Sequence, residues 1–354
     1  MKIKYYNIIL SLFILTFFSV NLLAGPRSKK GLSAAPELLI PVGSIGTSLN
    51  GSNLSNVSGV EALYWNPAGL GNILSKGGEV QFSHQRYIAD ININYFGAGY
   101  KLGNIGNIGV SIKSLGFGDI PITTVEAPDG TGETYSPTYI TAGVTFARAM
   151  TDRIYFGVTG KIISERIVNE SAVGFAADLG LQYIVGNTGL KFGVALKNLG
   201  PSMRFDGIDL EGFYPTIGTP SGSNNEPRRV TLAEFELPTS LSLGLSYDLN
   251  MNKNNMVTVN GLFQNNSFSA DDYVLGLEYN FKKIFYLRGS YNFDQDFFQT
   301  KSSRDDRLWG TSFGAGVKYN FKGLNVGIDY ALRLVGNNAK ALGQNHFFTV
   351  GLGF

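Results

Sequence analysis

Cysteine is absent from this chain of 354 residues. The protein therefore has no disulfide framework, no cysteine metal ligand and no thiol nucleophile. Histidine is almost absent as well, since only His84 and His346 occur. Two histidines are too few for a defended metal site, so we expect neither a metal nor another cofactor.

Charge is scarce too. Charged residues make up 16% of the chain, against about a quarter in an average protein, and the formal net charge is +2. This balance gives no basis for a nucleic-acid partner or an acidic partner. After residue 24 the chain also lacks an apolar run long enough for a membrane-spanning helix, which needs about 20 residues.

Aromatic residues and glycine are abundant instead. Phe, Trp and Tyr account for 13% of the chain, and 45 of its residues are glycine. Few charges, many aromatics and many glycines, without a long apolar run, are typical of a β-barrel that lies in lipid.

The N-terminus has the pattern of a secretory signal peptide. Lys2 and Lys4 form a basic region, Ile8–Val20 is an apolar core too short to span a bilayer, and Ala24 precedes the expected cut. We assign residues 1–24 to a cleaved signal peptide, with an uncleaved anchor as the alternative. The mature protein is then either soluble and exported or an outer-membrane barrel.

From residue 79 onward, apolar and polar residues alternate almost to the end of the chain. Successive side chains of a strand point to opposite faces, so this alternation predicts strands with one apolar and one polar face. Val173 and Phe175, for example, share one face, and Asp178 and Gln182 share the other. The predicted strands are 79–87, 90–102, 107–116, 138–150, 153–166, 171–185, 189–199, 239–249, 256–264, 272–281, 284–293, 311–320, 324–334 and 346–354.

The connections distinguish a membrane barrel from a soluble sandwich, whose strands alternate in the same way. Short and long connections alternate along most of the chain, as in outer-membrane barrels with short periplasmic turns and longer external loops. The longest predicted loops are 117–137, 200–238 and 294–310. The short connections 88–89 and 167–170 depart from the rule.

The strand ends also fit an outer membrane. Aromatic residues such as Tyr247, Tyr279 and Tyr319 gather there, as an interfacial girdle requires. The chain ends on an alternating strand with Phe354, as substrates of the barrel-assembly machinery do. We therefore predict an all-β fold in the outer membrane: a 14-stranded antiparallel transmembrane β-barrel, residues 79–354, with a short N-terminal plug.

Residues 25–78 differ in composition from the strands, and we assign them to a plug inside the periplasmic end of the barrel. Their central stretch, Ser44–Gly71, is rich in Gly, Ser and Asn. The candidate binding residues of this stretch are Trp65, Asn66, Pro67 and Gly69. Proline fixes the chain direction, tryptophan offers apolar area with one donor, and glycine allows close approach. A structural role is therefore favoured over a direct ligand role.

The predicted lumen face carries charges of both signs, which favours mutual pairing over a wide pore selective for one sign. No serine signature such as G-x-S-x-G accompanies the two histidines, so we expect no catalytic residues and no enzyme activity. The predicted lumen charges are Lys161, Glu165, Asp178, Lys191, Lys197, Glu278, Arg288, Lys318, Asp329 and Arg333.

The segment Gly59–Leu70, GVEALYWNPAGL, resembles the ALYWNPAGL signature of PorV/PorQ-family outer-membrane proteins, which are relatives of the FadL-type fourteen-stranded barrels. Thr123–Val125 with Pro128–Glu133 is similar to the family's first long loop. Phe146–Arg148 with Thr151–Arg153, and Gly160–Lys161 with Asn169–Ala172, are similar to its middle strands. Family members usually carry an acidic ADDAS run before the signature. Here Glu61 is the one acidic residue that remains. Any function that the acidic run has in the family is therefore not carried over to this chain.

The resemblance implies a non-enzymatic component of type IX protein secretion, which binds exported proteins through their C-terminal signal domains. The implied partners are outer-membrane lipid, such secreted proteins and other secretion-system components. FadL-like relatives instead pass hydrophobic small molecules through the barrel wall, and this channel function is the alternative. The two functions place an apolar pocket differently: at the outer rim for cargo, at the plug for a solute.

Overall fold

The computed structural model describes residues 31–73, 75, 77–215, 225–294, 309–336 and 343–354. The predicted signal peptide lies outside these residues. No helix among them is long and apolar enough to cross a membrane.

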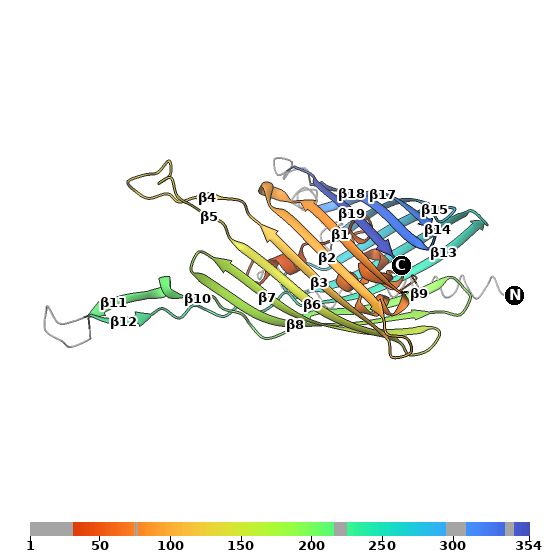
Figure 1. The fold of residues 1–354 in the computed structure, drawn as a ribbon, viewed down its shortest axis with the longest axis horizontal. Coiled ribbons are helices and arrows are strands. Elements are labelled where there is room, and N and C mark those ends of the chain that lie inside the picture. Colours follow the sequence, from red (N-terminus) through yellow and green to blue (C-terminus); the bar gives the residue numbers. More distant parts are fainter. Residues whose placement is uncertain (1–30, 74, 76, 216–224, 295–308, 337–342) are drawn as a thin grey trace.

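Fourteen antiparallel strands form a closed barrel (Figure 1). β8 pairs with β9, and the first strand, β1, pairs with the last, β19, where Glu79 lies opposite Gly353 and Arg86 opposite His346. The strands are β1 (Gly78–Arg86), β2 (Asn92–Lys101), β3 (Asn107–Gly116), β6 (Thr138–Ala149), β7 (Ile154–Ile167), β8 (Glu170–Ile184), β9 (Leu190–Leu199), β13 (Ser240–Asn252), β14 (Asn255–Asn266), β15 (Asp272–Phe281), β16 (Phe285–Asp294), β17 (Trp309–Phe321), β18 (Leu324–Val335) and β19 (Asn345–Gly353). The predicted fold is confirmed, with bounds that differ by a few residues at most.

The two faces of the wall are also as predicted. On β8, Val173 and Phe175 are each 58% exposed on the outside, whereas Gly174 and Asp178 face the lumen and are buried. Such an outward apolar face suits contact with hydrocarbon.

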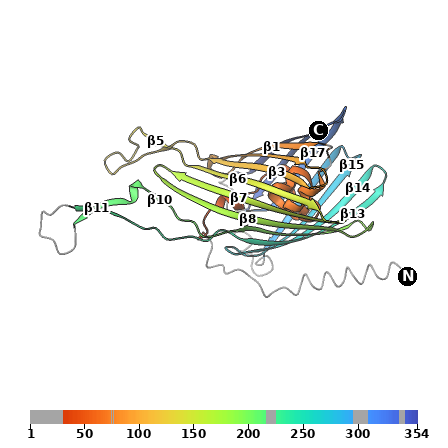
Figure 2. The same ribbon diagram turned by 60° about the horizontal axis from the view of Figure 1, so that its bottom comes forward.

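Two of the long connections form hairpins of their own, which the alternation of residues does not reveal. These elements are β4 (Ile120–Pro121) paired with β5 (Thr134–Tyr135), then β10 (Asp206–Gly207), η7 (Ile208–Leu210), and β11 (Glu211–Pro215) paired with β12 (Asn225–Arg229). Both hairpins extend away from the barrel, at the end opposite to the C-terminus (Figures 1 and 2). The short connection 88–89 contains a single turn, η6 (Ile88–Asp90). The predicted loop 294–310 lies largely outside the described residues.

The N-terminal segment forms a series of short helices inside the barrel (Figure 2). They are η2 (Pro36–Leu39), α2 (Ser44–Ser48), η3 (Ser52–Ser55), η4 (Gly59–Glu61), α3 (Ala62–Trp65) and η5 (Pro67–Asn72). Helices this short are not stable in isolation, so contacts with the wall must hold them.

The plug contacts both halves of the barrel, and its placement at the periplasmic end stays a prediction. η5 does lie against β6, β7 and β8, near the short turns. Ala35 and Leu38, however, pack beside Ile163 and Ala172, in the half of the barrel nearer the long loops. The reason is apolar burial, because Ala35 and Leu38 join a cluster that includes Met203 of the long insertion.

Glycines in the wall make room for the plug. A Cβ built on Gly157 would lie 2.6 Å from the backbone nitrogen of Ala68, and one built on Gly193 would lie 2.6 Å from Cα of Ser55. Packed atoms do not approach so closely, so a side chain at either position would push the plug away from the wall. The high glycine content thus has a cause in the packing of backbone against backbone.

We expect Gly157→Ala to reduce the stability of the barrel by about 1–3 kcal/mol, because the added methyl group overpacks this contact. Gly160→Ala on the same strand is the matched control, since a Cβ there meets nothing within 4 Å. Thermal unfolding of both variants in detergent micelles, followed by heat-modifiable gel mobility, measures the difference. Equal transition temperatures would contradict tight packing of the plug.

Candidate functional site

Asn66 ties the plug to the wall. Its side chain is fully buried, and Nδ2 donates to the carbonyl of Leu54 (3.0 Å) and to that of Leu181 on β8 (3.3 Å). Its Oδ1 accepts from the backbone N–H of Ala68 (3.2 Å) and so caps η5. One amide therefore joins η3, η5 and the barrel.

The other candidate residues of the motif also make internal contacts. Trp65 Nε1 donates to the carbonyl of Val42 (3.2 Å), and Pro67 lies against Gly157 of the wall. A Cβ at Gly69 would clash with the carbonyl of Val57 and with Cβ of Ala62, both in the plug. These contacts support the structural role that the sequence favours, and Trp65 in addition lines a cavity.

Hydrogen bonds between distant segments complete the seating of the plug. Ser44 bonds Thr349 of β19 through its N–H (2.9 Å) and its hydroxyl (2.8 Å). Gln182 Nε2 donates to the carbonyls of Leu54 (3.0 Å) and Val57 (2.9 Å). Sequence reasoning placed Gln182 on the polar face of its strand but did not identify any of these residues as contacts of the plug.

Glu61, the one acid that remains in the signature region, is buried in this interface. Its carboxylate accepts from Gly46 N–H (2.8 Å) and from Gln81 Nε2 on β1 (2.7 Å). Burial raises the pKa of Glu61 above its ordinary value, and these two hydrogen bonds oppose the rise. The carboxylate thus links α2 to the first strand.

A cavity of about 170 Å³ lies between the plug and the wall. The plug side is mostly apolar, whereas the wall side carries mostly amides, hydroxyls and charges. The plug residues that line it are Leu38, Leu39, Pro41, Thr47, Asn50, Tyr64 and Trp65. The wall and loop residues are Lys197, Asn198, Ser240, Leu262, Gln264, Asn266, Ser269, Asp272, Val274, Asn292 and Arg333.

Two cations face this cavity over aromatic rings. Lys197 Nζ lies 4.0 Å from the centre of the Tyr64 ring, and the Arg333 guanidinium lies 4.8 Å from that of Trp309. Within the described part of the chain neither cation forms an ion pair. Asp272, the acid in the lining, accepts instead from the amides of Asn266 (3.0 Å) and Asn292 (2.9 Å).

Several other lumen charges pair with one another, as predicted. Arg288 bonds both Glu278 (2.6 Å) and Asp329 (2.7 Å), and Lys161 bonds Asp178 (2.5 Å). Lys197 and Arg333 therefore differ from their neighbours in having no carboxylate partner among the described residues.

The pairing of β8 with β9 is irregular at one place beside the cavity. We call this place, at residues 172–176 of β8, the seam. β8 pairs regularly with β9 as far as Leu179 opposite Leu196, and then the register shifts. The carboxylate of Asp178 accepts the backbone N–H of Asn198 (2.8 Å), which has a left-handed φ of 60°. Pro201, three residues after Asn198, has no N–H and cannot donate a ladder hydrogen bond. Residues 172–176 consequently have no ladder partner on this side among the described strands.

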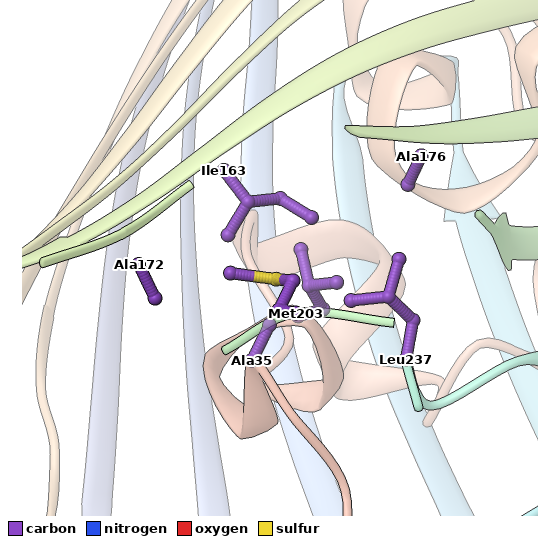
Figure 3. Close-up of a cluster of buried hydrophobic side chains, with 7 residues drawn as sticks. Ala35, Ile163, Ala172, Ala176, Met203 and Leu237 are labelled. Carbon is purple, nitrogen blue, oxygen red and sulfur yellow. The ribbon is translucent and has the colours of Figure 1, made fainter. Parts of the chain in front are cut away.

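Apolar side chains cover this seam from inside. Met203 and Leu237, from the two ends of the insertion, pack against Ala35 of the plug and against Ala172 and Ala176 of β8 (Figure 3). The backbones of Met203 and Phe235 exchange two hydrogen bonds of 2.8 Å and hold the two ends together.

Apolar residues lie on both sides of this cover. Val173 and Phe175 are exposed on the outer surface of the same stretch. Leu38 belongs to the inner cluster and also lines the cavity. Apolar side chains therefore lie on both faces of the wall at this seam, and one of the inner ones borders the cavity.

No family model and no curated protein matches the chain. Among solved structures, the toluene transporter TodX of Pseudomonas putida is similar with a TM-score of 0.54 and 14% identity, over 89% of this chain and 97% of that one. A FadL homologue of Pseudomonas aeruginosa has a TM-score of 0.50 and 11% identity, over 89% and 98%. A TodX deletion mutant, described as a monoaromatic hydrocarbon channel, has a TM-score of 0.50 and 14% identity, over 89% and 98%.

At these identities the likeness shows the fold alone. The chain has the fold of FadL-type outer-membrane barrels. The three similar proteins are a transporter, its mutant and a homologue of a FadL barrel, and none is an enzyme. The comparisons support the FadL-type part of the resemblance and do not show the PorV/PorQ family or type IX secretion.

Asn66→Asp should loosen the plug and raise the leakage of small ions through the barrel. The change replaces two amide donors by a carboxylate that faces two carbonyl oxygens, and each buried group left unpaired costs about 1–3 kcal/mol. Conductance of single barrels in planar bilayers measures the leakage. Asn104→Asp, in the exposed turn between β2 and β3, is the control. Equal conductance of the two variants would remove Asn66 from the seating of the plug.

Proposed function

We propose that the protein is an outer-membrane channel for small hydrophobic molecules that carry a polar or anionic end. The observation that carries this proposal is the cavity beside the plug, with its apolar plug side and its two cations, Lys197 and Arg333. An apolar body can lie along the plug, and an anionic end can pair with cations that have no carboxylate partner in the described part of the chain.

The interrupted seam supports passage rather than storage. A solute that leaves the cavity towards lipid needs a place where the wall has no continuous hydrogen-bonded ladder. β8 lacks that ladder at residues 172–176, and the side chains of Met203 and Leu237 close the place. Side chains can change rotamer without breaking backbone hydrogen bonds, so this closure can open reversibly.

The fold likeness also supports a channel. The similar structures include a toluene transporter and a monoaromatic hydrocarbon channel, which handle apolar molecules. The charged lining of the present cavity favours a solute with a polar end, such as a fatty acid, over a pure hydrocarbon.

A disulfide across the seam should block uptake. A Cβ built on Gly174 would lie 2.6 Å from Cγ of Met203, so Gly174→Cys with Met203→Cys is within reach of a disulfide, and the chain has no cysteine of its own to interfere. We expect cells that express the oxidised double variant to take up a labelled medium-chain fatty acid no faster than cells without the protein. A reducing agent should restore uptake.

The control disulfide joins two strands whose ladder is intact. Thr145→Cys with Thr159→Cys fits, since these hydroxyls lie 2.7 Å apart on β6 and β7. We expect the seam disulfide, but not the control disulfide, to block uptake. Equal uptake by both oxidised variants would contradict passage at the seam. A wild-type protein that gives no uptake above the empty host would contradict the channel function itself.

A second candidate function, the docking of exported proteins, is favoured by one observation. The β11–β12 hairpin stands clear of the barrel, and Phe213 on it is 73% exposed (Figure 1). Arg229 braces the hairpin by ion pairs to Asp206 and Glu211. An exposed apolar side chain on a braced hairpin suits a protein partner, as the PorV/PorQ resemblance implies.

Deletion of residues 208–232 separates the two functions, because it removes the hairpin and leaves Met203 and Leu237 in place. If the hairpin binds secreted proteins, the deletion should abolish the capture of C-terminal signal domains while fatty-acid uptake remains. Capture of the same domains by the deletion variant and by wild type alike would count against this function.

A further inference from the structure

A pair of buried carboxyl groups lies where the plug covers the seam. Glu37 belongs to η2 of the plug, and its side chain is 1% exposed. Glu165 belongs to β7, where it lies opposite Ala172 of the seam, and it is 4% exposed. Their neighbours Leu38 and Ile163 pack together in the cluster that closes the seam. The two acids are therefore part of the cover itself.

The carboxyl of Glu37 meets the carboxyl of Glu165 rather than an N–H donor. Glu37 Oε1 and Oε2 are buried, and among the described residues no N–H group donates to them. The polar side chain within hydrogen-bonding reach is that of Glu165. Two ionised carboxylates repel each other, whereas a protonated carboxyl donates to an ionised one. The contact is therefore satisfied when the pair holds one proton.

The charge beside the pair favours a proton over a metal ion. Lys113 of β3 is buried, and its ammonium donates to the backbone carbonyls of Glu37 (2.5 Å) and Ile40 (2.6 Å). With one shared proton, the two carboxyls and this ammonium are neutral together. Two ionised carboxylates leave an excess negative charge, and a divalent cation would leave an excess positive one. Burial favours the neutral arrangement, because a buried net charge loses its hydration.

The other titratable and charged groups around η2 do not supply a cation to the pair. They are Lys161 and Asp178, which pair with each other, Lys197 over the Tyr64 ring, Tyr139 of β6, and the exposed Arg204, Glu234 and Glu236 at the base of the insertion. Burial raises the pKa of the Glu37 carboxyl above its ordinary value, and its hydrogen bonds and the charge of Lys113 oppose the rise.

We propose that Glu37 and Glu165 form a proton-sensitive latch, which holds η2 over the seam while they share one proton and releases it when both ionise. The latch is closed at low pH and opens as the pH rises, because repulsion then acts between plug and wall. Ala35 and Leu38 flank Glu37 and leave the cluster with it, so the seam loses part of its cover. The role of the latch in solute passage rests on the proposed channel function, whereas the latch itself does not.

Hydrogen exchange of the full-length protein in lipid nanodiscs tests the latch without any solute. The amides of Ala34, Leu38 and Ile40 report on η2, because each donates to a backbone carbonyl. Exchange is measured from about pH 6 to about pH 9, since buried glutamates reach pKa values of about 8–9. After correction for the intrinsic rate, opening that releases one proton should increase about tenfold per pH unit above the pKa of Glu37. The amide of Leu54 in η3 is the internal control and should show no such increase.

Two variants remove the shared proton and keep a donor in its place. Glu37→Gln and Glu165→Gln each put an amide N–H beside the remaining carboxylate, so each should keep η2 closed and abolish the increase. Glu236→Gln is the matched control. Its side chain is an exposed acid at the base of the insertion, and its backbone carbonyl still accepts from Ala34 (2.9 Å), so it should behave as wild type.

Three results would overturn the proposal. One is exchange of η2 in wild type that follows the intrinsic rate at every pH, a comparison that needs no variant. Another is an increase with pH that persists in both folded glutamine variants. The third is protection restored at high pH by calcium and lost again with a chelator, which would show a cation site. Failure of the channel function is seen separately, as a lack of fatty-acid uptake by wild type, and leaves the exchange result unaffected.

Discussion

In the hydrocarbon layer of a membrane, no water is available to backbone N–H and C=O groups, so each must find a partner within the protein. Pairing of β1 with β19 meets this requirement by closing the ladder. Closure in turn creates an interior, and a lumen of this width must be filled or left wet. The plug fills it, and the wall accommodates the plug with glycine at positions such as Gly157 and Gly193. The seam at residues 172–176 is where the ladder is interrupted, and apolar side chains rather than hydrogen bonds cover it.

Local pattern predicts the barrel well. Alternation gives the strands and their faces, as on β8, because each residue's direction depends only on its neighbours in the chain. The hairpins β4–β5 and β11–β12 escape prediction, since their short strands carry no clear alternation. The reach of the plug escapes it too, because contacts such as Ala35 with Met203 join residues far apart in sequence. For the cavity, the sequence identifies Lys197 and Arg333 as lumen charges. It does not show that both lack a carboxylate partner among the described residues.

The motif around Trp65 identifies a type of plug more than a type of activity. Asn66 bonds Leu54 and Leu181, and none of its polar atoms is directed to a solute. Channel and docking proteins of this fold can therefore share the motif while they differ elsewhere. In the present chain that difference lies in the insertion 200–238, whose base covers the seam and whose β11–β12 hairpin projects from the barrel.

The hydrogen bonds of Ser44 join the plug to the last strand of the barrel. Ser44 bonds Thr349, which follows it by 305 positions. The plug is therefore synthesised early, whereas the strand that it binds is synthesised last. Contacts of such long sequence separation form slowly, because the chain between them must already be arranged. Until β19 joins β1, the plug has no complete site to occupy. Its richness in Gly, Ser and Asn suits this interval, since a segment of low hydrophobicity stays unfolded without aggregating.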